Sequence, residues 1–283
     1  MSKKLFDIQQ EITIKNIYLS GVSASSIAKS YNASSTAIHG VLKRLQVQKR
    51  NSGFHNRKHH LNDKFFEIID NPAKAQVLGM FFADGYNNRK HFSVVLSLQI
   101  CDKEYLEKIN NILEYDRPLT RDKNCYRLVI TRQKVSDDLD KLGCVQAKSF
   151  IVQFPINHIP EHLIKYFLLG FFEGNGNLYC NKKRNYYSLD IHSGSKNFLE
   201  EIKSILKKSI NIDCTIKPRR KIYRLRIASQ HNIFNFLNWM YQDCVFRLER
   251  KYEIFLNLAQ KIKDIGQSGR CRRNRSVSRW GPY

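Results

Sequence analysis

The sequence lacks the marks of a secreted or membrane-bound protein. Its seven cysteines lie far apart, with no CxxC pair, so we expect reduced thiols and neither disulfides nor a zinc site. The pairs His59/His60 and His158/His162 have no cysteine partners, and we interpret them as surface residues. No apolar run approaches the length of a bilayer span, and the N-terminus has no signal-peptide core. We expect a cytoplasmic protein, in a bacterial or phage-infected cell, without membrane contact.

Acidic residues are scarce. The 283 residues include 48 Lys and Arg but only 25 Asp and Glu, which gives a formal net charge of +23. An excess of this size predicts a polyanionic partner and favours nucleic acid over a merely solvated surface. The hydrophobic content of 42% allows the chain to bury real cores, so it is not disordered overall. Double-stranded DNA is the expected partner.

The first 48 residues show helical patterns and no strand pattern. Ser23 can cap a short helix through Lys29, "YNAS" supplies a turn, and Ser34 or Ser35 can cap a second helix. Helix, tight turn and helix is a DNA-reading arrangement, so we predict a helix-turn-helix domain over 1–48, with a generic three-helix unit as the alternative. The second helix would present to the major groove Ser35, Thr36, His39, Lys43 and Arg44.

Two basic segments show no periodicity. Residues 49–65 are interpreted as a basic linker that follows a phosphate backbone or minor groove, with a plain solvated tether as the alternative. Residues 266–283 are rich in arginine, whereas the body of the chain is rich in lysine. We assign no fold to this tail and expect a disordered phosphate-binding segment or a piece of foreign sequence.

The rest of the chain repeats itself. "SLQICDKEYLEKINNIL" at 97–113 resembles "SLDIHSGSKNFLEEIKSIL" at 188–206, with starts 91 residues apart. "YRLVI" at 126–130 resembles "YRLRI" at 223–227, 97 residues further on. Polar and apolar residues alternate in these strands, which predicts sheets with one packed face and one wet face. The predicted repeats span 66–160 and 161–265.

The polar faces of these strands carry basic residues. "YRLRI" places Arg224 and Arg226 on the face opposite Leu225 and Ile227, because side chains alternate along a strand. In the first repeat Arg127 takes the corresponding place. Basic faces on two related antiparallel sheets predict a continuous DNA-binding groove. The candidate DNA-binding residues of the sheets are Arg127, Lys217, Arg219, Arg224 and Arg226.

Each repeat opens with a helix that carries two small residues four apart. These are Gly79 and Ala83 in "VLGMFFADGYN", and Gly170 and Gly174 in "LLGFFEGNGNL". Small residues on one face let two helix backbones approach closely, which would bring the two helix ends together. Asp84 stands at such an end, where the helix dipole disfavours negative charge. A carboxylate in this place suits a bound Mg²⁺ that activates water for phosphodiester cleavage.

With both motifs and both repeats, residues 63–262 resemble LAGLIDADG homing endonucleases of the two-motif, monomeric type. The helix-turn-helix ahead of the core is similar to that of phage or bacterial members, free-standing or intron-encoded. The resemblance implies an α+β fold, a pseudo-twofold pair of αββαββα units forming a DNA-binding saddle, preceded by a small all-α domain. It implies a Mg²⁺-dependent endodeoxyribonuclease that cuts both strands of a long target site, using two or three divalent ions in an active parent. The metal positions fall on Asp84 and Asn175.

Family members also place lysines beside the metals. Lys148 and Lys251 recur late in each repeat, 103 residues apart. By resemblance they are candidates for a catalytic or phosphate-binding lysine. An ordinary surface lysine near a helix start is the alternative for each.

Position 175 departs from the family pattern, because Asn175 stands where an Asp is expected. An amide keeps an oxygen ligand but loses the charge, so metal affinity should fall in this half. Glu173 lies roughly 200° around the helix from position 175 and is expected to be structural. Three readings stay open: an engineered Asp→Asn change, a natural nickase or dead enzyme, or a non-cleaving DNA-binding regulator or intron RNA maturase. We expect Asn175→Asp to confer or strengthen cleavage.

Overall fold

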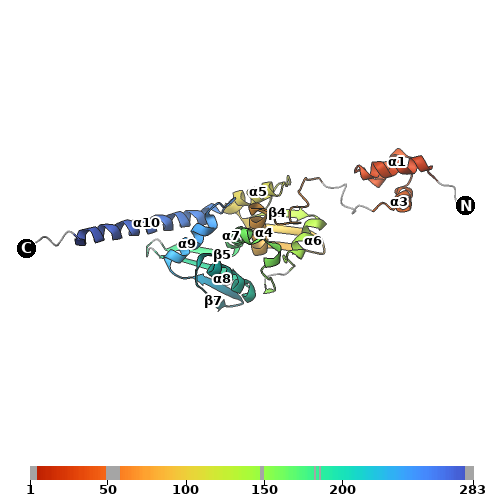
Figure 1. Ribbon diagram of the computed structural model, residues 1–283. Helices are drawn as coiled ribbons and strands as arrows, with labels where there is room; N and C mark the ends of the chain where they lie inside the picture. Colours follow the sequence, from red (N-terminus) through yellow and green to blue (C-terminus); the bar gives the residue numbers. More distant parts are fainter. Residues whose placement is uncertain (1–4, 49–57, 147–149, 182, 185, 278–283) are drawn as a thin grey trace, which may run out of the picture. The chain divides into compact units, whose positions relative to one another are not determined.

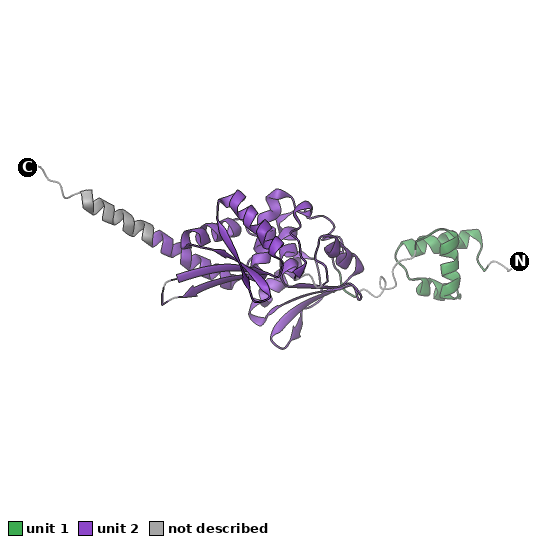
Figure 2. Cartoon of the chain, turned by 90° about the horizontal axis from the view of Figure 1, so that it is seen from below, with its two compact units in different colours: residues 1–60 green, residues 61–283 purple. Residues whose placement is uncertain are grey.

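The protein, in a computed structural model, forms two compact units, residues 1–60 and 61–283 (Figure 2). The structure describes residues 5–48, 58–146, 150–181, 183–184 and 186–277, with the side chains of the last helix described as far as Asp264. The candidate Lys148 lies outside the described residues, as do residues 49–57 of the predicted linker and 278–283 of the predicted tail.

The described part of the first unit is a small helical domain with a core of its own. Its helices are α1 (Ile8–Leu19), α2 (Ala24–Ser30) and α3 (Ser35–Arg44). Ser23 and Ser34 cap α2 and α3 by accepting backbone N–H groups with their side chains, so both predicted helices are confirmed and Ser34 is the second cap. Ile14, Ile38 and Val41 are fully buried between the helices. DNA reading by this unit stays a prediction.

The second unit consists of two similar halves followed by a long helix. The first half contains α4 (Pro72–Asp84), β1 (Gly85–Asn88), β2 (Ser93–Gln99), α5 (Lys103–Ile112), β3 (Thr120–Asp122), β4 (Cys125–Thr131) and α6 (Gln133–Lys141). The second half contains α7 (Ile164–Asn175), β5 (Gly176–Asn181), β6 (Tyr186–Ser193), α8 (Lys196–Ile210), β7 (Cys214–Arg219), β8 (Ile222–Ile227) and α9 (Gln230–Tyr241). The last helix is α10 (Glu249–Val277). The predicted pair of αββαββα units is therefore confirmed.

Each half folds into a four-stranded antiparallel sheet. The strand orders are β1-β2-β4-β3 and β5-β6-β8-β7, so the two sheets have the same topology. Helices α5 and α6 contact the first sheet, and α8 and α9 contact the second. Figure 2 shows the helices of this unit gathered on one side and the strands of both sheets on the other. Among the described residues, the opposite face of each sheet carries no helix.

The strand register corrects one of the sequence matches. Gly85 pairs with Leu96, and the equivalent Gly176 pairs with Ile191, so equivalent residues of β2 and β6 lie 95 positions apart rather than 91. The cause is a longer β5–β6 hairpin. The two offsets differ by four residues, an even number, so each strand residue stays on the same face of its sheet. The sequence match therefore predicted the packed face correctly although its offset was wrong. The 97-residue match is confirmed, because Leu96 pairs with Leu128 and the equivalent Ile191 pairs with Leu225.

A single apolar cluster joins the two halves of the second unit. Its centre is the helix pair α4 and α7, which lie side by side (Figure 1). In the part of the chain that the structure describes, no helix is long and apolar enough to cross a membrane. Helix α10, as bounded, includes residues 266–277 of the arginine-rich segment, whose side chains lie outside the description. Disorder of that tail stays a prediction.

Candidate nucleic-acid interface and two-helix site

The site begins with the close approach of α4 and α7. A Cβ atom built on Gly79 would overlap the carbonyl group of Phe167, and one built on Gly170 would overlap that of Gln76. At the helix ends, a Cβ atom on Gly174 would overlap the Cβ atom of Ala83. The small residues therefore lie at the contact, as predicted, and they let backbone meet backbone without side chains between them.

This approach brings the two motif ends together. A Cβ atom built on Gly174 would lie 2.8 Å from Oδ2 of Asp84, so the Asp84 carboxylate lies against the last turn of α7, next to Asn175. Asp84 is exposed and Asn175 is half-buried. Asn175 also lines a hollow of about 180 Å³ together with Ala83 and His192. The predicted neighbours are thus in one place, while their role as metal ligands stays a prediction.

The donor set does not fit a pair of divalent ions. Of the two motif ends, one supplies a carboxylate, Asp84, and the other supplies only the amide of Asn175. No group of three or more His, Cys, Asp or Glu side chains able to hold an ion occurs among the described residues. Mg²⁺ is a hard cation that relies on charged oxygen ligands, and two such ions at close range need several of them.

A histidine that sequence reasoning missed lies beside position 175. The His192 ring is hydrogen-bonded to the backbone of Asn175, and its Nε2 lies 3.3 Å from Nη1 of Arg219. Burial lowers the pKa of His192, and although the Asp190 carboxylate opposes this shift, the Arg219 and Arg224 guanidinium groups add to it. A ring with a lowered pKa is mainly uncharged at neutral pH, and here it joins the end of α7 to the basic sheet.

The end of α7 is fixed from inside the protein. Glu173 is buried and its Oε1 accepts the backbone N–H of Leu248 at 2.7 Å, which confirms that this carboxylate is structural and faces away from the site. Lys251 is also buried, and its Nζ donates to the carbonyl oxygens of Phe172, Glu173 and Gly176 at 2.7, 2.8 and 2.6 Å. Burial raises the pKa of Glu173 and lowers that of Lys251, while each charge opposes the other's shift.

Lys251 therefore differs from the surface and phosphate-binding readings, while a catalytic role stays a prediction. It is not a surface lysine, because its side chain is buried at the start of α10. It is also not placed to hold a phosphate, because an ammonium group has three N–H donors and three carbonyl oxygens at the end of α7 take them. Its position is that of a helix cap, where a cation offsets the negative end of the dipole.

The polar surroundings of Glu173 occur in one half only. Gln76 and Tyr105 are buried near it, and Gln76 Nε2 donates to the carbonyl oxygen of Phe246 at 2.5 Å. Burial, and then the Glu173 charge, raise the pKa of Tyr105. The repeat-equivalent positions in the other half are all aromatic and pack on one another: Phe82, Phe167 and Phe198. The two halves therefore share a backbone but not a core chemistry.

The uncovered face of the second sheet is strongly basic. The register places Lys217 beside Arg224 and His192 beside Arg224, which forms one row across three strands. Arg219 and Lys217 are exposed, and Arg224 and Arg226 are half-buried. The predicted basic residues thus share one face. Their contact with DNA stays a prediction.

The corresponding face of the first sheet carries much less free charge. Arg127 lies on it opposite Ser97 and Thr120, but its guanidinium forms an ion pair with Asp122. The salt bridge is half-exposed, and such pairs cancel charge while adding little stability. The two sheets therefore present different electrostatic surfaces on these faces.

The predicted DNA-reading residues of α3 divide into two groups. Thr36, His39 and Lys43 line one hollow of about 460 Å³ on the outer side of the helix. Arg44 instead pairs with Glu11 of α1, and the Ser35 hydroxyl donates to that of Ser25 at 3.3 Å. These last two side chains therefore have partners inside the first unit, and the outward group is the better candidate for groove contact.

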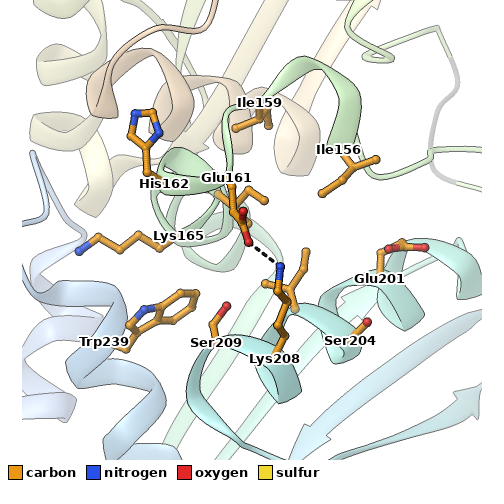
Figure 3. A pocket seen from close by; sticks show the side chains of 12 residues that line it. Ile156, Ile159, Glu161, His162, Lys165, Glu201, Ser204, Lys208, Ser209 and Trp239 are labelled. Atoms are coloured by element: carbon orange, nitrogen blue, oxygen red, sulfur yellow. Dashed lines mark hydrogen bonds and ion pairs between the residues drawn. The ribbon is translucent and has the colours of Figure 1, made fainter.

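A larger hollow, of about 560 Å³, lies away from both sheet faces. Its lining comes from α7, α8, α9 and the turns before α7, and Figure 3 shows Glu161 and Lys208 joined across it by an ion pair of 2.6 Å. Ile205 and Trp239 supply part of its apolar lining. It contains none of the predicted site residues, so we do not assign the function to it.

Comparison with known proteins agrees with this architecture. The family model described as "LAGLIDADG-like domain" matches residues 163–239, from the start of α7 into α9. Among curated proteins, the uncharacterized protein MJ0314 of Methanocaldococcus jannaschii is 27% identical over 161 residues, covering 52% of this chain and 58% of that protein. The match thus spans little more than half the length of this relative.

A solved structure shows the same fold. The homing endonuclease I-WcaI, bound to its DNA recognition sequence, is similar over 75% of this chain and 96% of its own, with 18% identity and a TM-score of 0.52. The N-terminal LAGLIDADG domain of DUF199/WhiA covers 63% of this chain and 89% of its own, with 19% identity and a TM-score of 0.43. At 18% identity the likeness to I-WcaI shows the fold rather than the activity.

Proposed function

Since residues 163–239 form a LAGLIDADG-like domain within a two-repeat LAGLIDADG homing endonuclease fold, we propose that the chain binds a long site in double-stranded DNA. The saddle of two sheets takes the duplex, and the basic row of Arg224 and Lys217 contacts its phosphates. We further propose that hydrolysis is impaired, so that the chain nicks one strand or leaves both intact.

The observation that carries the proposal is the contrast between the two helix ends. Asp84 and Asn175 meet where the two motif helices converge, but only Asp84 brings a negative charge. Any remaining hydrolysis therefore depends on Asp84, with Mg²⁺ as the expected ion. Without a second carboxylate the chain's own residues can hold and orient DNA more readily than they can support cleavage of both strands.

A DNA-binding regulator without nuclease activity is the second candidate, and Asn175 is the observation that favours it. The basic sheet, the helix pair and the helical first unit all serve binding equally well when no bond is cut. An RNA maturase of the same fold is a possible outcome of the test below, because a basic groove attracts any polyanion.

The proposal is tested with DNA selected by the full chain from a genomic duplex library, with competition by RNA. Supercoiled plasmids that carry the selected sites are then incubated with Mg²⁺. The unaltered chain should produce nicked circles or no cut, and Asn175→Asp should produce or increase linear product. Asp84→Asn should abolish any nicking while duplex binding persists.

Two results contradict the proposal in different ways. If Asn175→Asp binds the selected sites but never cuts them, the endonuclease part of the proposal is wrong. The DNA-binding regulator is then the favoured function. If RNA displaces duplex DNA at equal concentration, the proposed DNA partner is wrong. The RNA maturase is then the favoured function. Because phosphate contacts dominate all three readings, a steep loss of affinity with salt is expected in each and does not discriminate among them.

A further inference from the structure

The two uncovered sheet faces differ most at one pair of equivalent rows. In the second sheet Asp190 lies between Asn177 and Arg226, one row beyond the glycine that follows the motif helix. The same row of the first sheet also lies one residue beyond the motif glycine. It holds Tyr86, Val95 and Val129. The two rows occupy equivalent places in the two repeats, but the row in the second sheet is charged and the row in the first sheet is almost wholly apolar.

Arg226 is held in one orientation by a buried carboxylate. Its Nε donates to Oδ1 of Asp190 at 2.8 Å and its Nη2 donates to Oδ2 at 3.1 Å, so the pair is bidentate. Asp190 is 3% exposed, whereas the Arg226 side chain is 39% exposed. The carboxylate takes the edge formed by Nε and Nη2. The other edge, formed by Nη1 and the second N–H of Nη2, points away from Asp190.

That remaining edge matches one base. Two parallel N–H groups of an arginine suit the O6 and N7 acceptors that guanine presents in the major groove. An arginine already fixed by Asp190 loses little side-chain freedom on binding, and its direction is set before contact. Asp190 is therefore a positioning residue, and Arg226 is the residue that would touch the base.

The apolar row suits a different base. Tyr86 is 48% exposed, and Val95 and Val129 are half-buried on the same face. The valine side chains have no hydrogen-bonding group, so they can contact only apolar parts of a base pair. The C5 methyl group of thymine is the apolar feature of the major groove.

We infer that the two rows read different bases in the target site, an inference that rests on the proposed duplex binding. Arg226, positioned by Asp190, specifies guanine in the half-site under the second sheet. The row of Tyr86, Val95 and Val129 specifies thymine at the pseudo-twofold-related position under the first sheet. The target is therefore not a palindrome at this pair of positions, although the backbone that reads it is nearly twofold.

The test is selection of long randomised duplexes by the full chain and by single variants. Arg226→Ala should lower the guanine preference at one position on the order of 10- to 100-fold, the range expected for a lost bidentate contact. Asp190→Asn should weaken the preference at that same position although Arg226 is still present. It should not weaken binding to random duplex, because it removes a negative charge from a DNA-binding face. Lys208→Ala, on α8 behind the sheet, is the control and should change no position.

A transplant gives the converse test. Val95→Asp combined with Val129→Arg should create a guanine preference at the position where the unaltered chain selects thymine. If this variant does not fold, the Arg226→Ala selection decides alone. The inference is wrong if Arg226→Ala selects the same base at every position as the unaltered chain. It is also wrong if the transplant variant folds but shows no new guanine preference. Either result leaves the proposed duplex binding intact. Failure to enrich any duplex overturns the proposed function and this inference with it.

Discussion

At the scale of single residues, Lys251 shows how a helix end can be stabilised without solvent or metal. Its ammonium group binds three carbonyl oxygens of the last turn of α7 and its cap, and one of them, that of Phe172, also accepts the backbone N–H of Gly176. The side chain of Glu173, in the same last turn, accepts the backbone N–H of Leu248 just before α10. The two side chains therefore fasten α7 to the beginning of α10.

The first prediction concerns this lysine. Lys251→Met keeps the length of the side chain but removes the ammonium donor from the three carbonyl oxygens and its charge from beside Glu173. We expect the free energy of unfolding to fall by about 2–4 kcal/mol, as for loss of one partner of a buried charged network. Urea unfolding followed by circular dichroism measures it.

The matched control for Lys251→Met is Lys263→Met, at an exposed position of the same helix. A surface change of this kind should stay within about 0.5 kcal/mol of the unaltered chain. Equal stability of the two variants would show that the capping contacts contribute nothing.

Sequence reasoning at this scale succeeded where chemistry was local and failed where it depended on distant partners. The caps Ser23 and Ser34 and the buried role of Glu173 follow from helix geometry, which is set within a few residues. The burial of Lys251 depends on α10 returning to α7, some 75 residues away in sequence. No local pattern distinguishes such a lysine from one on the surface.

At the scale of elements, the helix pair α4 and α7 organises the second unit. Contact between backbones at Gly79 and Gly170 leaves no room for side chains, so both halves are held at one crossing. The motif spacing predicted this contact, because small residues four apart share a helix face. The same reasoning could not predict that Asp190 lies opposite Arg226, because strand register across a hairpin depends on loop length.

The second prediction tests this crossing. Gly79→Ala or Gly170→Ala places a methyl group on a carbonyl group of the facing helix, and neither backbone can yield without separating the helices. We expect a loss of about 3 kcal/mol or more in the free energy of unfolding, at the upper end for overpacking. Urea unfolding followed by circular dichroism measures it.

Gly40→Ala provides a contrast of opposite sign. A Cβ atom there meets only Nη1 of Arg44, at an ordinary 3.7 Å. A glycine inside a helix is less stable than alanine, so this change should stabilise α3 by about 0.5–1 kcal/mol. Wild-type stability of Gly79→Ala would contradict the close approach of α4 and α7.

At the scale of the whole molecule, the chain consists of two compact units with independent cores. The helical first unit and the two-repeat second unit each bury their own apolar cluster. Each also presents basic side chains, Lys43 on α3 in one and Lys217 on β7 in the other. Two modest DNA contacts joined by a chain can exceed either one alone, because the second contact forms at a high effective concentration.

The last prediction separates the two units. Residues 61–283 alone should fold and select the same bases under the sheets, since the sheets and their core lie wholly within this part. Their affinity for the selected duplex should fall at least about 10-fold, because one of two linked contacts is lost. Anisotropy titrations at fixed salt measure the change.

The full chain carrying Thr36→Ala, His39→Ala and Lys43→Ala should lose affinity to a similar extent while keeping the stability of its first unit, since these side chains lie on the outer face of α3. Unchanged affinity in both cases would mean that the first unit binds something other than this DNA.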